Sequence, residues 1–424
     1  MENAVIQSAN QLMELVGLVI VAGLIFGKIS EIIKMPDVVL FILAGIILGP
    51  SLLNWINIDK YPVENQLILS FGAAYILYDG GREIDFKILN KVKMSVSLLA
   101  TAGVLISTVI VGYVAAKVFN IPVYYGLLMG SVIASTDPSV LVPLFKSMNI
   151  SNKLKQTIIS ESAFNDAAGA VITFSLIGII LGGEFSLSQS VMQLVKSIAG
   201  GVLIGVVAGY LSHLFVDEKK FGILRDHPAE LMIATVTGAY LISDRFGFSG
   251  FMAVFVVGMF CGNKKVFDFW IPEHSFQTHL RFKEVFTVLL RMMIFVILGT
   301  QLVFENLFSN LTPALIVVAV LIFIARPVSV IFSMIADRKA QWKWQEVVYM
   351  MWVRETGVIP AALSGMILTM GVDHADIISS VTFATILITL TLQASTSKLL
   401  AKVLNLDTPS ISDMKILNEV NTQA

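Results

Sequence analysis

The hexapeptide Glu-Ser-Ala-Phe-Asn-Asp at positions 161–166 places four polar side chains within a long run of apolar residues. In a helix of 3.6 residues per turn, Glu161 lies one turn from Asn165, and Ser162 lies one turn from Asp166. All four polar side chains therefore share one face of the predicted helix. If the run crosses a lipid bilayer, this face must point into the protein, because charged side chains are costly in lipid.

The rest of the chain has the composition of a membrane protein. It has 424 residues, of which 56% are hydrophobic and 14% are charged, and its mean hydropathy is +0.82. A water-soluble chain of this length needs more charge to cover its surface. Apolar runs of about 20 residues, long enough to cross a hydrocarbon core of about 30 Å, recur from end to end. We therefore predict an all-α polytopic membrane protein with the lipid bilayer as its solvent.

Turn residues and charges divide the chain into thirteen candidate transmembrane spans. The first follows a neutral start without a clear cleavage site, which favours a retained span over a signal peptide. The ninth is the shortest. The spans cover approximately residues 11–29, 37–53, 64–80, 94–118, 123–147, 153–181, 191–215, 228–244, 248–262, 283–302, 311–335, 345–369 and 376–402.

The distribution of positive charge orients these spans. Of the 29 Lys and Arg residues, 22 fall in segments on one side of the predicted membrane. The other side carries Lys60, Lys117 and Arg245, and four more lie within or at the edge of spans, namely Lys196, Arg291, Arg326 and Arg354. Because positive loops stay cytoplasmic, the N-terminus is predicted outside and the C-terminus in the cytoplasm. A missed span would reverse every later loop, so the asymmetry supports the count of thirteen.

The odd count also predicts an inverted repeat. Spans one to six superpose on spans eight to thirteen only with opposite orientation, and the seventh span acts as a connector. Two spans at matching places are interrupted, the fifth at Ser135 to Pro138 and the twelfth at Arg354 to Pro360. Proline removes a helical hydrogen bond, and the released carbonyls are tolerated in lipid only where they line a cavity or hold a ligand. Paired broken helices indicate a site near the bilayer midplane.

The broken fifth span and the polar face of the sixth supply oxygen ligands. Asp137 and Thr136 lie at the break, and Ser162 and Asp166 face it. Carboxylate, hydroxyl and carbonyl oxygens suit a small hard cation and suit soft metals poorly. Asp166 is the predicted carrier, because a partly desolvated carboxylate can exchange a proton for a cation. One proton released for each monovalent cation makes turnover electroneutral, and Asn165 supplies an amide where a second titrating acid could stand.

Arg326, in the eleventh span, is the expected counter-charge for Glu161. Its forked donors could bind this carboxylate and also reach the side-chain oxygen of Asn165. We expect the pair to be mainly structural, and a direct ligand role for Glu161, through water, stays open. Arg354 and Glu355 are also embedded, and local pairing near the break explains them as well as contact with an ion does.

Several other kinds of chemistry lack support in the sequence. With 29 basic and 30 acidic residues, the net charge is −1, which offers no field for nucleic acid. A single cysteine, Cys261, allows no intrachain disulfide and no Cys-rich metal site. No P-loop, His-Glu-x-x-His or Gly-x-Ser-x-Gly pattern occurs, so we expect neither an enzyme nor a cofactor.

Two further sets of residues carry structural expectations. The histidines are predicted to be solvated loop or span-end residues rather than pH sensors. They are His213, His227, His274, His279 and His374. Glycines of the seventh span are predicted to form a close-packing helix face. They are Gly200, Gly201, Gly205 and Gly209.

Thr136-Asp137-Pro138, residues 161–166 and Arg326-Pro327 resemble the signature of NhaP-type sodium/proton antiporters, in the branch with an Asn-Asp pair. The similarity covers nearly all of the chain. It implies an NhaA/NhaP-like antiporter fold, in which a core domain moves like an elevator beside a dimerisation domain, and it implies a homodimer. Expected parts are dimerisation helices 1–3 (1–90) and 8–10 (219–305), core helices 4–6 (91–182) and 11–13 (306–403), connecting helix 7 (183–218) and a short cytoplasmic tail (404–424).

The same resemblance implies roles for the site residues. Asp166 would bind sodium or a proton in alternation, with Asp137, Ser162 and the Thr136 carbonyl completing the sodium shell and Glu161, Asn165 and Arg326 bracing it. One departure stands out, because many relatives carry Leu-Arg-Gly at the break of the twelfth span. Here Thr356 precedes Gly357, and the nearest arginine, Arg354, is displaced by two residues. No role is therefore transferred to that arginine.

The resemblance implies secondary active exchange of Na⁺, and also Li⁺, for H⁺ across the plasma membrane, with a role in pH homeostasis. Potassium/proton exchange through the same residues stays open, because such exchangers share much of this framework. A sodium-coupled symporter would need a substrate pocket, and a cation channel would need a continuous pore. Acidic residues beside interrupted helices favour a carrier over both.

Overall fold

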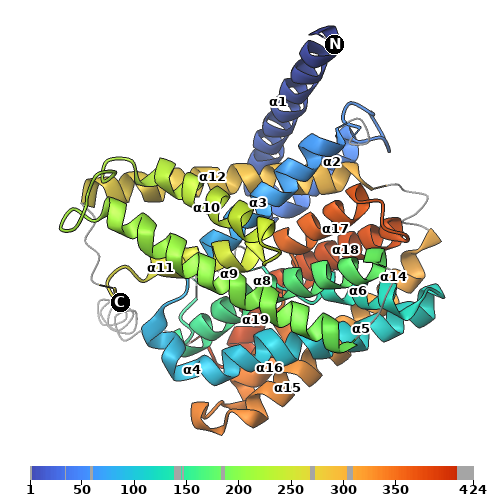
Figure 1. Cartoon of the computed structure of the whole chain (residues 1–424). Helices are drawn as coiled ribbons and strands as arrows, with labels where there is room; N and C mark the ends of the chain where they lie inside the picture. Colours follow the sequence, from blue (N-terminus) through green and yellow to red (C-terminus); the bar gives the residue numbers. More distant parts are fainter. Residues whose placement is uncertain are drawn as a thin grey trace, which may run out of the picture.

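The computed structural model describes residues 2–33, 35–57, 61–137, 145, 148–182, 187–267, 273–302 and 309–407, and the regular elements within these ranges are all helical. The first six predicted spans correspond to elements that the chain forms in the expected order (Figure 1). They are α1 (Glu2–Ile33), α2 (Asp37–Leu48), α3 (Pro62–Arg82), the continuous α4 (Phe86–Leu98), η2 (Leu99–Gly103) and α5 (Val104–Phe119), then α6 (Val123–Ile133) and α8 (Asn152–Gly182).

The remaining spans follow in the same way. They are α9 (Leu187–Val216), α10 (Pro228–Arg245), α11 (Gly250–Gly262), α12 (Glu273–Thr300), the continuous α14 (Leu311–Val320), η3 (Leu321–Ala325) and α15 (Arg326–Ala336), the broken α16 (Trp344–Trp352) and α17 (Val358–Thr369), and the continuous α18 (Ala375–Ile388), η5 (Thr389–Ala394) and α19 (Ser395–Val403). A short 3₁₀ turn, η4 (Arg338–Ala340), precedes α16.

Length and composition alone identify six described helices that could cross a membrane, and α2, α6, α11 and α17 are shorter apolar helices. The short ninth span is a helix because the Ser249 side chain caps the backbone N–H of Met252. Three boundaries were predicted too late, since the first, fourth and tenth spans begin at Glu2, Phe86 and Glu273 with polar turns that the apolar pattern omits. The latter part of the fifth span, with Pro138, lies outside the described residues, as do positions 408–424 of the tail.

The helices form two groups that lie side by side. In the first group α2 packs on α12, α3 on α11, and α9 on α10 and α11. In the second group α5 packs on α6 and α14, and α8 packs on α4 and α6. Helix α17 packs on α3 and α12, and one continuous cluster of buried apolar side chains runs through both groups. Figure 1 shows α1 projecting from the first group and α4, α15 and α16 on the opposite side of the molecule.

Glycine determines how closely α9 and α11 approach each other. A Cβ added to Gly205 would lie 2.5 Å from the carbonyl oxygen of Ala253, and one added to Gly201 would lie 2.6 Å from that of Ser249. Real Cβ atoms do not approach backbone oxygens this closely, so both positions require glycine. The close-packing face predicted for the seventh span is therefore confirmed.

The two halves of the repeat also share an irregularity. The fourth and eleventh spans, which correspond under the repeat, each contain a π-helical turn, η2 and η3. These turns pack against the facing span, where Ser329 donates to the carbonyl of Gly103 at 3.0 Å and its hydroxyl lies 3.1 Å from that of Ser107. A π turn frees backbone groups and often occurs at functional sites. Arg326 follows η3 directly, so this turn sets the position of its side chain.

Candidate ion-binding site

The two broken helices meet at their breaks. After α6 ends at Ile133, the chain runs without helix to Asp137, and the chain between α16 and α17 does the same over residues 353–357. The backbone N–H of Asp137 donates to the carbonyl of Glu355 at 2.8 Å. The Asp137 carboxylate in turn accepts from the N–H of Val358 at 3.0 Å, at the first turn of α17. One interrupted span thus supplies the carboxylate that caps the other.

Gly357 allows this contact. A Cβ at this position would lie 1.9 Å from Oδ2 of Asp137, which is far inside van der Waals distance. The backbone of Gly357 is extended, with φ of −148°, so the requirement comes from the close approach of the carboxylate and not from the backbone conformation. The break of the twelfth span is therefore shaped to receive Asp137.

Arg354 links the same two breaks. Its side chain is 1% exposed, donates to the carbonyl of Ile133 at the end of α6, and lies 3.4 Å from the Thr356 hydroxyl. A cation at a helix C-terminus satisfies orphan carbonyls and opposes the negative end of the helix dipole. The sequence left both a local pair and contact with an ion open for Arg354, whereas in the structure it links the two interrupted spans.

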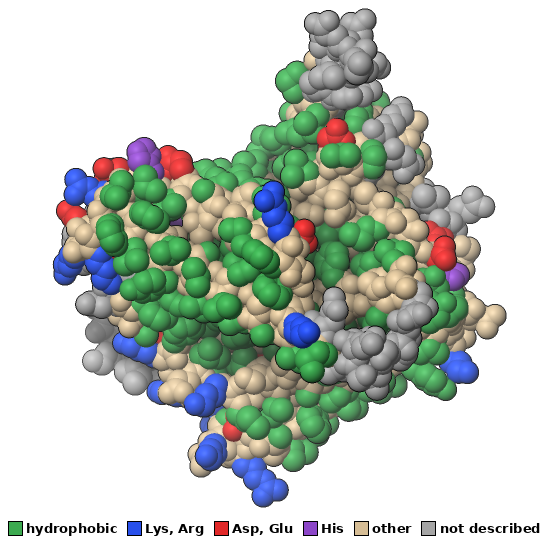
Figure 2. All heavy atoms as spheres, viewed as in Figure 1, with side chains coloured by type: hydrophobic (Ala, Val, Ile, Leu, Met, Phe, Trp, Pro, Cys, Tyr) green, Lys and Arg blue, Asp and Glu red, His purple; other side chains and the backbone are tan. Residues whose placement is uncertain are grey.

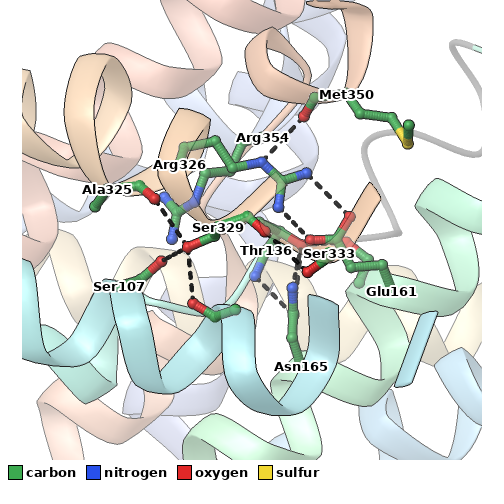
Figure 3. Close-up of polar contacts among 12 residues, drawn as sticks. Ser107, Thr136, Glu161, Asn165, Ala325, Arg326, Ser329, Ser333, Met350 and Arg354 are labelled. Atoms are coloured by element: carbon green, nitrogen blue, oxygen red, sulfur yellow. Dashed lines mark hydrogen bonds and ion pairs between the residues drawn. The ribbon is translucent and has the colours of Figure 1, made fainter. Parts of the chain in front are cut away.

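The polar face of α8 is buried against the break of α6. The Thr136 N–H donates to Oδ1 of Asn165 at 3.0 Å, and Nδ2 of Asn165 donates to the Thr136 hydroxyl at 2.9 Å (Figure 3). The hydroxyls of Thr136 and Ser162 also form a hydrogen bond. This reciprocal pairing fixes Thr136 and leaves Asn165 without freedom to move toward an ion.

Asp166 lies on this face with part of its carboxylate unused. The residue is 3% exposed, and within the described chain its Oδ1 has no hydrogen-bond partner. The Asp137 carboxylate and the Ser135 hydroxyl are its electrostatic neighbours. Two buried carboxylates thus influence each other electrostatically at the break, and such a pair is unfavourable unless a proton or a cation accompanies it.

Glu161 and Arg326 form the predicted ion pair. The guanidinium donates to both carboxylate oxygens, at 2.9 Å from Nη2 to Oε2, and both side chains are buried. Its Nε donates to the Met350 carbonyl at 3.0 Å, near the end of α16 (Figure 3). The expected reach of Arg326 to Asn165 is wrong, because Asn165 is engaged by Thr136. The arginine instead joins α8, α15 and α16.

Glu355 has an environment that the sequence did not predict. It is 0% exposed, and neither carboxylate oxygen has a hydrogen-bond partner among the residues that the structure describes. It follows Arg354 in the chain, and its own backbone carbonyl accepts from the N–H of Asp137. The acidic character of the break is therefore greater than Asp137 and Asp166 alone provide.

The prediction for the histidines is wrong in two cases. His213 is 4% exposed and His279 is 8% exposed, so neither is a solvated residue. The ring of His227 is largely exposed, and His374 stacks edge-on against Tyr125 at 4.8 Å between ring centroids. His213 and His279 belong to the first helix group and take no part in the site described above.

The donor set of the site is one of oxygen atoms. In the described ranges no group of three or more His, Cys, Asp or Glu side chains is arranged to hold a metal ion. The groups that converge are instead the carboxylates of Asp137 and Asp166 and the hydroxyls of Ser162 and Thr136, together with backbone carbonyls at the breaks. These ligands suit an alkali cation that is bound and released, and they are poorly suited to a resident transition metal.

Comparison with known proteins places this geometry in a family. Residues 17–403 match the family model described as "Sodium/hydrogen exchanger, transmembrane". The chain belongs to the sodium/hydrogen exchanger family. It is a polytopic membrane transporter that exchanges a monovalent cation for protons, and it is not an enzyme.

Individual relatives cover most of the chain. A probable Na⁺/H⁺ antiporter 2 of Methanocaldococcus jannaschii is 28% identical over 410 residues, which cover 90% of this chain and 94% of that protein. The K⁺/H⁺ antiporter NhaP of Alkalimonas amylolytica is 27% identical over 411 residues, which cover 96% of this chain and 69% of that protein. The structure of the sodium proton antiporter MjNhaP1 from M. jannaschii at pH 8 matches with a TM-score of 0.83 at 28% identity. The match covers 93% of this chain and 99% of that one. The predicted antiporter fold is therefore confirmed.

The buried pair of Glu161 and Arg326 gives a stability prediction. Arg326→Met leaves a carboxylate without its counter-ion in the core, and we expect a loss of about 3–5 kcal/mol. Adding Glu161→Leu removes that stranded charge, so the double variant should recover most of the loss. Thermal unfolding in detergent measures both. An additive loss in the double variant would show that the two side chains do not act as a pair.

Proposed function

We propose that this antiporter exchanges Na⁺, and also Li⁺, for H⁺ with one proton per cation, and that both ligands bind Asp166. The observation that carries the proposal is the buried Asp166 carboxylate near Asp137, one oxygen of which has no hydrogen-bond partner among the described residues. A charged carboxylate in this position is unfavourable unless a cation or a proton accompanies it. Because both ligands use the same oxygens, only one is bound at a time.

The other ligands of the sodium ion would come from Asp137, Ser162 and Thr136, the last through its carbonyl oxygen. The Thr136 hydroxyl is already shared with Ser162 and Asn165, which leaves the carbonyl as its better ligand. Glu161 is held in two hydrogen bonds by Arg326, so it would reach the ion only through water. Asn165 and Arg326 would brace the site without touching the ion.

The electroneutral stoichiometry rests on a single titrating group. Asn165 precedes Asp166 and carries no charge, and the carboxylate of Asp137 caps α17. A carboxylate that accepts a hydrogen bond from a helix N-terminus is stabilised as the anion. Asp137 would therefore stay charged through the cycle, and Asp166 alone would gain and lose the proton.

Sodium is favoured over potassium by the extent of the similarity. The matches to the sodium/proton antiporters of M. jannaschii cover at least 94% of those proteins, whereas the match to the potassium/proton antiporter of A. amylolytica covers 69% of it. The identities, 28% and 27%, do not separate the two. Potassium/proton exchange through the same residues is the second candidate.

A cavity between the helix groups offers a route to the site. It has a volume of about 450 Å³ and is lined by Phe174 and Ser175 of α8 and by Tyr240, Asp244 and Phe251 of α10 and α11. The α8 residues that line it, Val171 to Ile179, lie between about one and four helical turns beyond Asp166 in the chain. We propose that residues 91–182 and 306–403 move as the core domain against the dimerisation segments 1–90 and 219–305, with 183–218 as the connecting helix, and expose the site to each side in turn.

Orientation and assembly belong to the same proposal. The positive charges of the loops favour an external N-terminus, a cytoplasmic C-terminus and a plasma membrane location. The resemblance to NhaP-type antiporters supports a homodimer, which would appear as two chains per particle in light scattering corrected for detergent. The dimerisation segments named above would form its contact.

The central prediction concerns Asp166→Asn. The amide cannot release a proton, so sodium-driven proton flux in vesicles with a pH-sensitive dye should fall to the level of empty vesicles. Asp376→Asn, at the exposed start of α18, is the matched control and should leave the flux unchanged. Full flux in Asp166→Asn would remove the mechanism.

Ion selectivity and stoichiometry give a second prediction. Proteoliposomes under opposed sodium and potassium gradients should show proton flux that follows sodium. Because one proton competes with one cation, the apparent KM for sodium should rise about tenfold per pH unit on the acid side. Clamping the membrane potential should leave the rate unchanged, since no net charge crosses. Flux that follows potassium would establish the second candidate, and a response to voltage would exclude the one-to-one ratio.

The orientation is tested by labelling single cysteines in a chain carrying Cys261→Ala. A cysteine at Asn120 should react with an impermeant maleimide added outside intact cells, and one at Lys339 should react only after the cells are opened. Both positions are exposed at helix ends, so access depends on the side of the membrane. The reverse pattern would overturn the assignment.

A further inference from the structure

A second polar cluster lies in the first helix group, away from the ion site. A cavity of about 50 Å³ is lined by the ends of α3, α9 and α11 and by the first turns of α10 and α12. This volume holds about three waters or one small ion. The wall is partly apolar, and its polar side chains are Tyr78, Arg82, Ser212, His213, Thr235, Cys261 and His279.

His279 presents an unused donor in this cluster. Its Nε2 lies 2.8 Å from Nη1 of Arg82. A guanidinium can only donate, so Nε2 is the acceptor and the ring proton resides on Nδ1. This Nδ1–H is buried, and no partner for it exists within the described part of the chain. The residue is 8% exposed, so an acceptor for this N–H must be bound inside the cavity.

Arg82 and Tyr78 present two more hydrogen-bond donors without a described partner. Nε of Arg82 is buried and has no hydrogen-bond partner among the described residues. The hydroxyl of Tyr78, a fully buried residue, also lacks one and has only the weakly accepting Cys261 sulfur beside it. The guanidinium lies 5.8 Å from the centroid of the Tyr78 ring, so the two side chains face the same space.

The nearest carboxylate is already engaged. Asp79 is held by Lys283 at 2.7 Å and by the Thr287 hydroxyl at 3.2 Å. Of the carboxylates that the structure describes, none has an oxygen within 4.0 Å of a nitrogen of Arg82. His213 lies 2.8 Å from the Gly209 carbonyl through Nδ1, which must therefore donate. The cluster thus combines a positive charge with three buried donors, and buried donors without acceptors are costly.

We propose that this cavity binds a phosphate group. The group would be either free inorganic phosphate or the headgroup phosphate of an anionic phospholipid. Tetrahedral oxygens would accept from Arg82, His279 and Tyr78 together, and guanidinium is the side chain best matched to phosphate. Figure 2 shows lysine and arginine side chains, together with acidic ones, along the edge of the molecule where α10 and α12 begin in Figure 1. Leu231 and Met232 of α10 supply an apolar wall for the stem of a lipid.

The position of the cavity connects it to the rest of the protein. Arg82 is the last residue of α3, and the carbonyl of the next residue, Glu83, accepts from Gln156 of α8 at 3.1 Å. The bound oxyanion would hold the end of α3 in place where it contacts the second helix group. This role is separate from the proposed ion site and does not require it.

Delipidated protein in detergent tests the proposal. Low millimolar phosphate, at which general salting effects are small, should raise the melting temperature above that in chloride of equal ionic strength. Native mass spectrometry after mixing with phosphatidylglycerol or phosphatidylcholine distinguishes the two sources, because only the anionic lipid should be retained if a headgroup binds. Stabilisation by phosphate alone assigns the free anion, and retention of phosphatidylglycerol assigns the lipid. If neither stabilisation nor retention is found, the proposal is overturned.

Two variants link the effect to the cavity. Tyr78→Phe should not lower the melting temperature without ligand, because the hydroxyl it removes has no partner, but it should weaken phosphate binding about tenfold or more. Arg82→Gln should abolish binding. Arg338→Gln changes an exposed arginine at the start of η4; it is the matched control and should bind as the parent does. Binding that is equal in Tyr78→Phe, Arg82→Gln and the parent would place the anion elsewhere and refute the site.

Discussion

Every backbone group released where α6 ends and where α16 gives way to α17 must find a partner inside the protein, because lipid provides none. The two breaks meet this constraint by forming hydrogen bonds with each other. Asp137 donates its N–H to the Glu355 carbonyl and accepts from Val358, while Arg354 donates to the carbonyl of Ile133. The chain segments that carry the candidate ion ligands are therefore fixed by the same bonds that allow the helices to be interrupted.

The polar face of α8 could be predicted because helix geometry converts sequence spacing into direction. Residues four apart must lie on one face, and that face must avoid lipid, so Glu161, Ser162, Asn165 and Asp166 were bound to be buried together. Arg326 followed from charge balance, since a buried carboxylate needs a cation nearby. These inferences needed no knowledge of how the helices pack.

What could not be predicted depended on packing between distant segments. The reach of Arg354 across to α6 and the pairing of Asn165 with Thr136 require the two breaks to cross at a particular height, which spacing within one helix does not encode. His213 and His279 were misjudged for the same reason. Each lies near the end of a span, where the sequence reads as interfacial, yet neighbouring helix ends extend over both and remove them from water.

The two polar clusters have opposite needs: the breaks are short of hydrogen-bond donors, and the second cluster is short of acceptors. The shortage at the breaks affects how transport depends on whether an ion is bound. At the breaks, carboxylate oxygens exceed the donors available to them, so the empty site carries unbalanced negative charge in a region without solvent. In the proposed mechanism, moving such a core through the bilayer would cost more than moving it with a cation or a proton bound. Electrostatics would then hold back an empty core, and exchange rather than leak would follow from the same shortage of donors around Asp166.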